Sequence, residues 1–397
     1  MLLCGASSKH VDNATASACH VVATAVISDK RLWHFRRRQQ PRPSAIGSNM
    51  ATPIESTLYP KITTHIRQIL GALEHLHRDP ESREEDVHLD PIPIVGTVKL
   101  HGTHADIRIH ADDRIVFQSR NIADLQPTND NAGFAMAMST KTKALLRLRD
   151  IIVARFVQLN PHTPIEPDKP VIVAGEWIGK SIQKGVAISS LSKRFVIISI
   201  NINGQWQKDS DYGGIALPNH DIYNISRAGV FTSTLYPKEV NRTTIELEAL
   251  ADQVAAQCPF AATFGIEGEG EGIVWKLADS PHNANPTLWF KTKGGRFKPT
   301  FIAPPKQSPE GREAIVQAAA AVAKVWTSER RLEQGLEYLD EMSVKRDMKG
   351  LSTFLKWVQH DVMTEEQGYI VEHKIDKQML NIEVAKIAKA WYFPRLR

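Results

Sequence analysis

The chain has 397 residues, of which 42% are hydrophobic and 23% charged, and its formal net charge is +5. At about 150 residues per domain this length indicates two or three domains, and the composition excludes disordered, collagen-like and coiled-coil classes. No stretch reaches the ~18 apolar residues of a membrane-spanning helix. The three cysteines lack metal-ligand spacing and form an odd set, which indicates a reducing compartment rather than a disulfide framework.

The excess positive charge lies in residues 1–49. This segment holds seven of the 49 basic and two of the 44 acidic side chains, so the remainder carries 42 of each. Its Ser, Ala and Arg content without a sustained apolar period is typical of a mitochondrial transit peptide. A disordered basic tail, or a stretch upstream of a true start at Met50, would show the same pattern, and the protein would then be cytoplasmic or nuclear. A nucleic acid would have to bind the rest of the chain through local clusters of charge.

Residues 50–304 show the mixed periodicities of an α+β body. Apolar residues at helical spacing predict helices at 62–77, 141–159 and 244–257. Short apolar or alternating runs predict strands at 95–100, 105–110, 114–118, 171–177, 195–202, 272–277 and 288–291.

Beyond Pro304-Pro305 the composition changes, and proline is absent between Pro309 and Pro394. Thr364 and Gln367 have the spacing of a capping box. We therefore predict an all-helical domain over residues 305–397. Its helices are expected at 314–325, 330–342, 351–362 and 377–391.

A lysine ends the first predicted strand and opens the motif Lys99-Leu-His-Gly-Thr-His104. A glycine turn at the rim of a sheet lets the backbone approach a ligand closely. A lysine amine becomes a nucleophile when burial or a neighbouring cation lowers its pKa. A surface lysine before a turn is the plain alternative.

Two later motifs carry further charge. In a strand, Glu271 would share a face with Ile273 and Trp275, opposite Val274 and Lys276, and its carboxylate could reach a metal or a ribose. Phe290-Lys291-Thr-Lys293 would point two ammonium groups the same way, which suits a triphosphate or a phosphodiester backbone. Solvated loops and strand faces would give the same patterns.

Three elements lie between these motifs: Ser119-Arg120-Asn121, Gly175-Glu176-Trp177-Ile-Gly179 and the strand that opens at Phe195. Glu176 places a carboxylate at a strand end. Phe195 could stack on a base, although from a single residue a core phenylalanine is the better explanation.

The order and spacing of these motifs over about 195 residues resemble the covalent nucleotidyltransferase superfamily of ligases and capping enzymes. The His-Gly-Thr after the lysine and the Gly-Glu-Trp-x-Gly element are most similar to the RNA ligase 2 family, which includes the RNA-editing ligases. The resemblance implies an antiparallel-sheet adenylation domain followed by the small helical domain. It also implies ATP, Mg²⁺ or Mn²⁺, and RNA ends as substrates, and we expect a monomer.

The resemblance implies a role for each matching residue. Lys99 would carry AMP covalently, while Lys291 and Lys293 would hold the phosphates. Contacts to the nucleotide or the metal would come from the remaining matches: His104, Arg120, Glu176, Phe195, Glu271 and Val274, with Glu176 and Glu271 at the metal.

Three positions depart from the family pattern. His104 stands where the family usually has Asn, and it can still donate a hydrogen bond. Ile198 and Ser199 stand where the family usually has an aromatic residue followed by Asp. Because Lys99, both lysines and both glutamates are retained, we do not infer an inactive enzyme.

The resemblance predicts three steps: lysyl-AMP formation, transfer of AMP to an RNA 5′-phosphate, and attack by a 3′-hydroxyl. A DNA ligase or a GTP-using capping enzyme is one alternative, although those usually carry Asp before the motif glycine and append a small β-barrel. A non-catalytic protein that binds RNA ends on a ligase scaffold is the other alternative.

Overall fold

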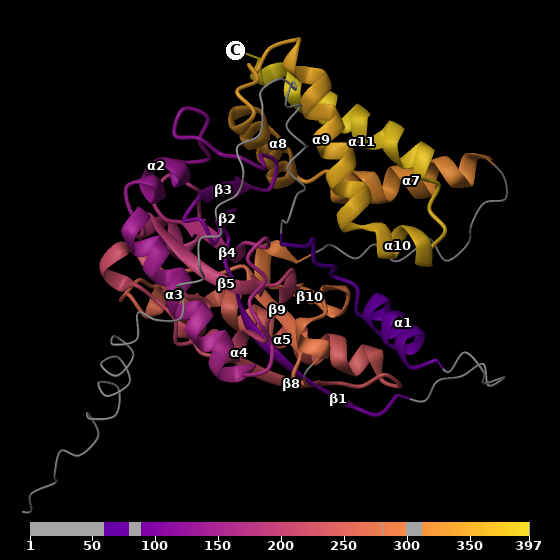
Figure 1. The fold of residues 1–397 in the computed structure, drawn as a ribbon. Coiled ribbons are helices and arrows are strands. Elements are labelled where there is room, and N and C mark those ends of the chain that lie inside the picture. The colour runs from indigo at the N-terminus through magenta and orange to yellow at the C-terminus, as the bar shows by residue number, and fades with distance from the viewer. Residues whose placement is uncertain (1–58, 79–88, 280, 299–311, 397) are drawn as a thin grey trace, which may run out of the picture. The chain divides into compact units, whose positions relative to one another are not determined.

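The computed structural model describes residues 59–78, 89–279, 281–298 and 312–396. The expectations for residues 1–49 and for a domain boundary near residue 304 lie outside these ranges. Up to residue 298 the described chain forms two sheets with helices, and from residue 312 it is helical (Figure 1). This confirms the predicted α+β class with antiparallel sheets and a helical C-terminal segment.

The first sheet has four antiparallel strands in the order β10-β9-β1-β8. Helices α1 (Ile66–His77) and α5 (Val240–Ala256) contribute apolar side chains to its core. Strand β8 was not predicted, because only the last of its five residues is buried and the others are polar or partly exposed. The strands are β1 (Ile92–Lys99), β8 (Phe231–Leu235), β9 (Gly272–Leu277) and β10 (Phe290–Lys293).

The second sheet has the order β3-β2-β4-β5-β6, and β7 (Ile222–Asn224) adds one parallel pairing to β5. Helices α2 (Phe134–Ser139) and α3 (Thr142–Leu159) cover its core-facing side (Figure 1). The antiparallel strands are β2 (Thr103–Ile109), β3 (Ile115–Ser119), β4 (Val171–Ile178), β5 (Arg194–Ile202) and β6 (Gln205–Trp206).

Most predicted boundaries lie within a few residues of the observed ones, but the strand expected at 288–291 begins later. Residues Pro286–Leu288 form a 3-10 turn, which the Asn285 side chain caps by accepting from the Thr287 backbone. The strand therefore starts at Phe290 and includes Lys293.

Residues from 312 onward form five helices around a core of their own. Ser328 caps α8 and Asp376 caps α11 through their side chains. The predicted capping box is wrong: Thr364 lies in the last turn of α9, where its hydroxyl donates to the His360 carbonyl at 2.7 Å. The helices are α7 (Arg312–Trp326), α8 (Glu329–Glu341), α9 (Gly350–Glu365), α10 (Gln367–Glu372) and α11 (Lys377–Tyr392).

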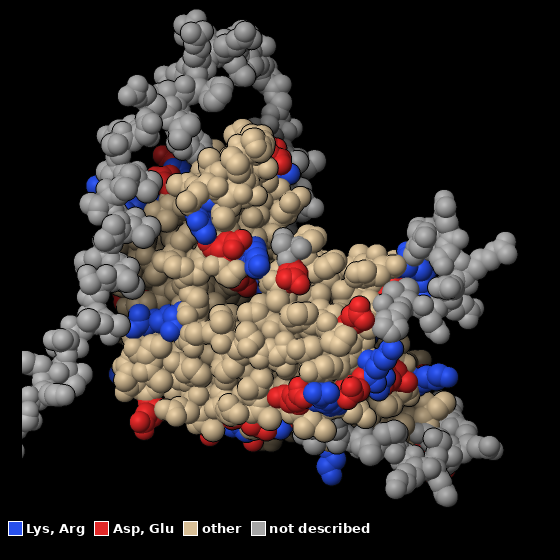
Figure 2. Space-filling model, turned by 90° about the horizontal axis from the view of Figure 1, so that it is seen from below, with Lys and Arg blue, Asp and Glu red and all other residues tan. Residues whose placement is uncertain are grey.

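The described part of the chain contains no helix with the length and apolar character needed to cross a bilayer. On the face shown in Figure 2, basic and acidic side chains of the described residues lie interspersed along the edges around an uncharged centre. This distribution agrees with the balanced charge of residues 50–397.

Candidate active site

Three neighbouring strands bring the first motif to the later ones. Lys99 ends β1 and pairs with Gly272 of β9, while Lys293 of β10 pairs with Gly272 from the other side. Glu271 directly precedes β9. Lys99 and Glu271 therefore meet at one end of the sheet, although 172 residues separate them in the sequence.

The Glu271 carboxylate is the centre of this cluster and is 3% exposed. Its Oε2 accepts from Lys99 Nζ at 2.7 Å and from His101 Nδ1 at 3.2 Å, and its Oε1 lies 3.5 Å from Lys293 Nζ. Burial alone would raise the pKa of Glu271, but Lys99, His101 and Lys293 outweigh it and hold that pKa well below its usual range. The carboxylate is therefore ionised, with two lysines and a histidine around it.

Glu271 does not lie on the face that strand alternation predicts. It lines a cavity together with Val274 and Lys276, whereas Ile273 and Trp275 are buried in the core. Gly272, at φ +156°, interrupts the alternation between Glu271 and the strand, and a Cβ at this position would lie 2.1 Å from the Thr292 carbonyl oxygen. The glycine thus turns the carboxylate toward Lys99.

Lys291 and Lys293 both contact Glu365, the last residue of α9. Lys291 Nζ donates to Glu365 Oε1 at 2.8 Å, and Lys293 Nζ lies 3.8 Å from Oε2. Burial alone would raise the pKa of Glu365, but the two lysines and Arg331 hold it well below its usual range. A carboxylate of the helical segment thus occupies a position between the two lysines that were predicted to hold phosphates.

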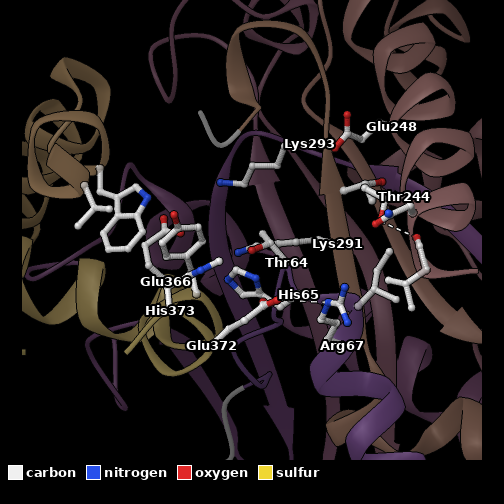
Figure 3. A pocket seen from close by; sticks show the side chains of 17 residues that line it. Thr64, His65, Arg67, Thr244, Glu248, Lys291, Lys293, Glu366, Glu372 and His373 are labelled. Atoms are coloured by element: carbon white, nitrogen blue, oxygen red, sulfur yellow. Dashed lines mark hydrogen bonds and ion pairs between the residues drawn. The ribbon is translucent and has the colours of Figure 1, made fainter. Parts of the chain in front are cut away.

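The same two lysines also line a second, smaller cavity of about 260 Å³ (Figure 3). His65 and Arg67 reach it from the N-terminal end of α1. Glu366 reaches it from just before α10, and Glu372 from the last residue of α10. Acidic and basic groups are mixed around this cavity, so its lining does not favour a ligand of one charge.

A hydrogen bond between Gly102 and Glu176 links the start of β2 to β4, close to Lys99 in the motif. The Gly102 backbone donates to Glu176 Oε1 at 2.9 Å. Burial raises the pKa of Glu176, and the charges of Lys99 and His104 offset only part of that rise. A Cβ at Gly102 would lie 2.4 Å from the Trp177 carbonyl oxygen, so the close approach of β4 requires the motif glycine.

His104 points one ring nitrogen at a buried carboxylate that sequence reasoning missed. Its Nε2 lies 3.0 Å from Asp106 Oδ1, at ion-pair distance although not aligned as a hydrogen bond, and Asp106 is fully buried. The His104 ring also stacks on Tyr59 with centroids 5.9 Å apart. The spacing of His104 and Asp106 on one face of β2 was the available signal.

Arg120 and Val274 line the large cavity, as the predicted contacts require, but Phe195 does not. Phe195 is fully buried in the core of the second sheet, where its ring stacks on Phe134 with centroids 5.7 Å apart. Strand alternation turns it away from the cavity, which Ile198 of the same strand lines instead. The structure therefore supports the core role for Phe195 and not the stacking role.

The large cavity has a volume of about 1070 Å³ and brings these side chains together. Sequence reasoning missed several of its lining residues, because a single tyrosine, aspartate or glutamate outside a motif carries no distinctive spacing. Of the predicted site residues, those lining it are Lys99, His104, Arg120, Glu176, Glu271, Val274, Lys291 and Lys293, and the missed ones include Tyr59, Asp209 and Glu365.

Helix α8 also reaches this region. The Arg330 guanidinium lies 3.7 Å from the centroid of the Phe297 ring and donates to His101 Nε2. His101 can then donate through Nδ1 to Glu271, which agrees with its pKa, lowered mainly by burial. Arg331, in contrast, pairs with Asp361 at 2.9 Å and with Glu366 at 3.0 Å.

The donor set suits a hard divalent cation. Glu176 and Glu271 are buried carboxylates that line one cavity, and the described residues contain no cluster of three or more His, Cys, Asp or Glu that could hold a metal by themselves. Magnesium is commonly held by one or two carboxylates together with substrate phosphates and water. The residues present therefore fit a metal that binds with a phosphorylated substrate.

The family model described as RNA ligase matches residues 92–293, which is just over half of the chain. No curated protein matches this sequence. The matched segment begins with β1 and ends with Lys293, and so includes every predicted site residue.

The chain is similar to solved structures of an RNA ligase from Naegleria gruberi. The form solved with PPi is 17% identical, the match covers 64% of this chain and 61% of that chain, and the TM-score is 0.36. A variant with AMP and Mn is 16% identical, the match covers 61% of this chain and 57% of that chain, and the TM-score is 0.36. The chain thus spans less than two thirds of the length of these ligases, and similarity at this level does not identify an activity.

Proposed function

We propose that this chain, which belongs to the RNA ligase family, is an ATP-dependent enzyme that joins an RNA 3′-hydroxyl to an RNA 5′-phosphate. One observation supports this most directly. The Lys99 amine lies 2.7 Å from the buried carboxylate of Glu271, in a cavity of about 1070 Å³ that Lys291 and Lys293 also line. The proposed nucleophile, a carboxylate and two further lysines therefore line one cavity.

In the first step the neutral Lys99 amine attacks the α-phosphorus of ATP. A nitrogen–phosphorus bond forms, the bond to pyrophosphate breaks, and the amine proton is released. A 5′-phosphate oxygen of RNA then displaces the lysine from AMP. Finally a 3′-hydroxyl oxygen attacks the activated 5′-phosphorus, AMP leaves, and the hydroxyl proton passes to solvent.

The residues act mainly by positioning and by charge neutralisation, as in other phosphoryl transfers. Glu271 holds Lys99 at the rim of the sheet and orients its amine toward the cavity. Lys291 and Lys293 neutralise phosphate charge once ATP displaces Glu365 from them. Arg120 lines the same cavity and is placed to contact the phosphate side of the nucleotide or the RNA end.

Glu176 and Glu271 would hold the Mg²⁺ or Mn²⁺ ion, with the phosphates completing its coordination. When bound, the ion supplies Lewis-acid stabilisation of the charge that develops on the phosphate oxygens. Glu176 also fixes the motif turn through Gly102.

We also propose that residues 50–304 form the adenylation domain and residues 305–397 a helical domain that positions RNA. Two basic residues of the helical segment, Arg331 and Arg346, pair with acidic residues of the same segment. Arg330 reaches the site at His101 and is better placed than these two to contact a phosphate.

Incubation of the purified protein with radiolabelled ATP or GTP and Mg²⁺ tests the proposal. We expect covalent AMP labelling that is acid-labile, as a phosphoramidate is, and sealing of nicked RNA. Labelling by GTP would favour a capping-type enzyme. No labelling by either nucleotide would favour the non-catalytic protein that binds RNA ends.

A further inference from the structure

A buried polar network closes one end of the large cavity. Lys276 Nζ donates to Ser199 Oγ at 2.8 Å and pairs with Asp209 Oδ2 at 2.6 Å. Ser199 Oγ in turn donates to Asp209 Oδ1 at 2.8 Å. Lys276 is 4% exposed and Ser199 is 3% exposed, whereas the Asp209 side chain is partly exposed, so the buried lysine and hydroxyl are satisfied by each other and by Asp209.

Aromatic side chains complete the surroundings of the Lys276 ammonium group. It lies 3.6 Å from the centroid of the Trp289 ring and 5.9 Å from that of Tyr59. Burial lowers the pKa of Lys276, and the charge of Asp209 acts against that change. Asp209 is thus the carboxylate that stabilises a cation held in a largely aromatic environment.

Ser199 and Asp209 contact Lys276 from two neighbouring elements. At this point strand β5 carries the hydroxyl of Ser199, which accepts from Lys276. Asp209 lies ten residues further along, in the short helix α4 (Asp209–Tyr212), and reaches back to Ser199 and Lys276.

This network faces the space where a nucleotide would bind. Asp209 and Lys276 line the same cavity as Lys99, and Lys276 lies on the same face of β9 as Val274. Ile198, next to Ser199, also lines it. The network therefore determines where the polar and apolar groups lie at the end of the cavity remote from the lysine cluster.

We propose that Asp209 is a positioning residue for nucleotide binding. It holds Lys276 against Trp289 and Ser199. It thereby sets the shape and charge of the part of the cavity that Val274 and Ile198 also line. This inference rests on the proposed reaction with ATP, because ATP is the ligand assigned to that cavity.

Asp209→Asn tests the inference, because it keeps the shape of the side chain and removes its charge. We expect the ATP concentration for half-maximal AMP labelling to rise about tenfold or more, since loss of one partner from a buried ion pair is costly. Labelling at saturating ATP should stay near that of the wild type, because Lys99 and Glu271 are untouched. Asp211→Asn is the matched control: it removes the same charge from the same helix at a residue that does not line the cavity.

A relocated carboxylate provides the decisive variant. Ser199 Oγ lies 2.8 Å from Lys276 Nζ, so an aspartate at position 199 can reach the ammonium group. The double variant Ser199→Asp/Asp209→Ser should recover the ATP dependence that Asp209→Asn loses. If the double variant does not fold, or folds without this recovery, the inference is overturned; it is also overturned if Asp209→Asn binds ATP like the wild type.

Calorimetric binding of ATP separates this inference from the proposed reaction. If the wild-type protein binds ATP but does not form lysyl-AMP, the proposed reaction fails. A weaker binding of ATP by Asp209→Asn, with recovery in the double variant, would still support the positioning role. If Asp209→Asn itself aggregates, the binding and labelling of the double variant decide alone.

Discussion

At the residue scale, the proposed chemistry depends on the Lys99 amine. Lys99→Ala should abolish AMP labelling while the fold is retained, because the side chain lies at the rim of β1 and its removal opens no core cavity. Lys99→Arg should fail as well, since a guanidinium stays protonated and cannot attack phosphorus. Labelling with radioactive ATP, together with circular dichroism to confirm folding, measures both effects. Persistent labelling of Lys99→Ala would contradict the assignment.

His104 is the second residue with a specific expectation. An Asn at this position can donate to Asp106, so His104→Asn should keep the fold and preserve or improve labelling. His104→Ala leaves the buried Asp106 carboxylate without its partner and should lower the free energy of unfolding by about 1–3 kcal/mol. Its ATP dependence should weaken too. Urea denaturation and labelling at varied ATP measure the two effects.

The double variant His104→Ala/Asp106→Ala provides the control for this pair. Removal of both partners should recover part of the stability that His104→Ala loses, because no buried charge is then left uncompensated. Equal stability and equal ATP dependence of His104→Asn, His104→Ala and the wild type would show instead that His104 has no role in nucleotide binding or in stability.

At the element scale, the contact between α9 and β10 places Glu365 on Lys291 and Lys293, the two lysines for which we propose phosphate binding. Glu365→Gln removes an anion that ATP phosphates would have to displace. We therefore expect the ATP concentration for half-maximal labelling to fall by about threefold or more. Without ATP the same variant should be less stable, by on the order of 1 kcal/mol, because Lys291 is buried and loses its counter-ion. ATP should then raise its melting temperature more than that of the wild type.

Glu372→Gln is the matched control for Glu365→Gln. Glu372 pairs with Arg67 at 3.4 Å, and both side chains are exposed, so its loss should change little. An unchanged ATP dependence of Glu365→Gln would show that the contact does not compete with the nucleotide.

At the scale of the whole molecule, the apolar cores indicate which parts can fold separately. One core lies entirely within the helices from α7 onward, and the others lie entirely before residue 298. A protein that ends at residue 304 should therefore fold and form lysyl-AMP, at an ATP concentration no higher than the full chain needs, because Glu365 is absent. Labelling across a range of ATP concentrations, with gel filtration to show a soluble protein, measures this.

Sealing of a pre-adenylylated RNA strand by the same shortened protein tests the RNA-positioning role of the helices. We expect sealing to fall while labelling is kept, and to fall further at high salt if phosphate contacts are lost. Normal sealing would rule the role out. Aggregation with loss of both steps would show that the helices mainly cover apolar surface.

Much of the secondary structure could be predicted from local pattern. The helical spacing of α3 and the apolar run of β4 are local patterns, and both elements were predicted within a residue of their observed limits. Strand β8 could not be predicted, because its pairing with β1 supplies the backbone hydrogen bonds that its own polar side chains do not indicate. The start of β10 depended on a turn capped by Asn285.

The sequence by itself determined the family resemblance and most residues of the site, because motif types and their order can be identified without knowledge of distances. Only the tertiary structure decided which of these residues meet. It turned Phe195 into the core through strand alternation, and it brought Asp209 to Lys276 from outside the motifs. It also placed Glu365 between Lys291 and Lys293. Such partners come from distant segments whose side chains carry no periodic signal, so their roles depend on the fold and not on local sequence.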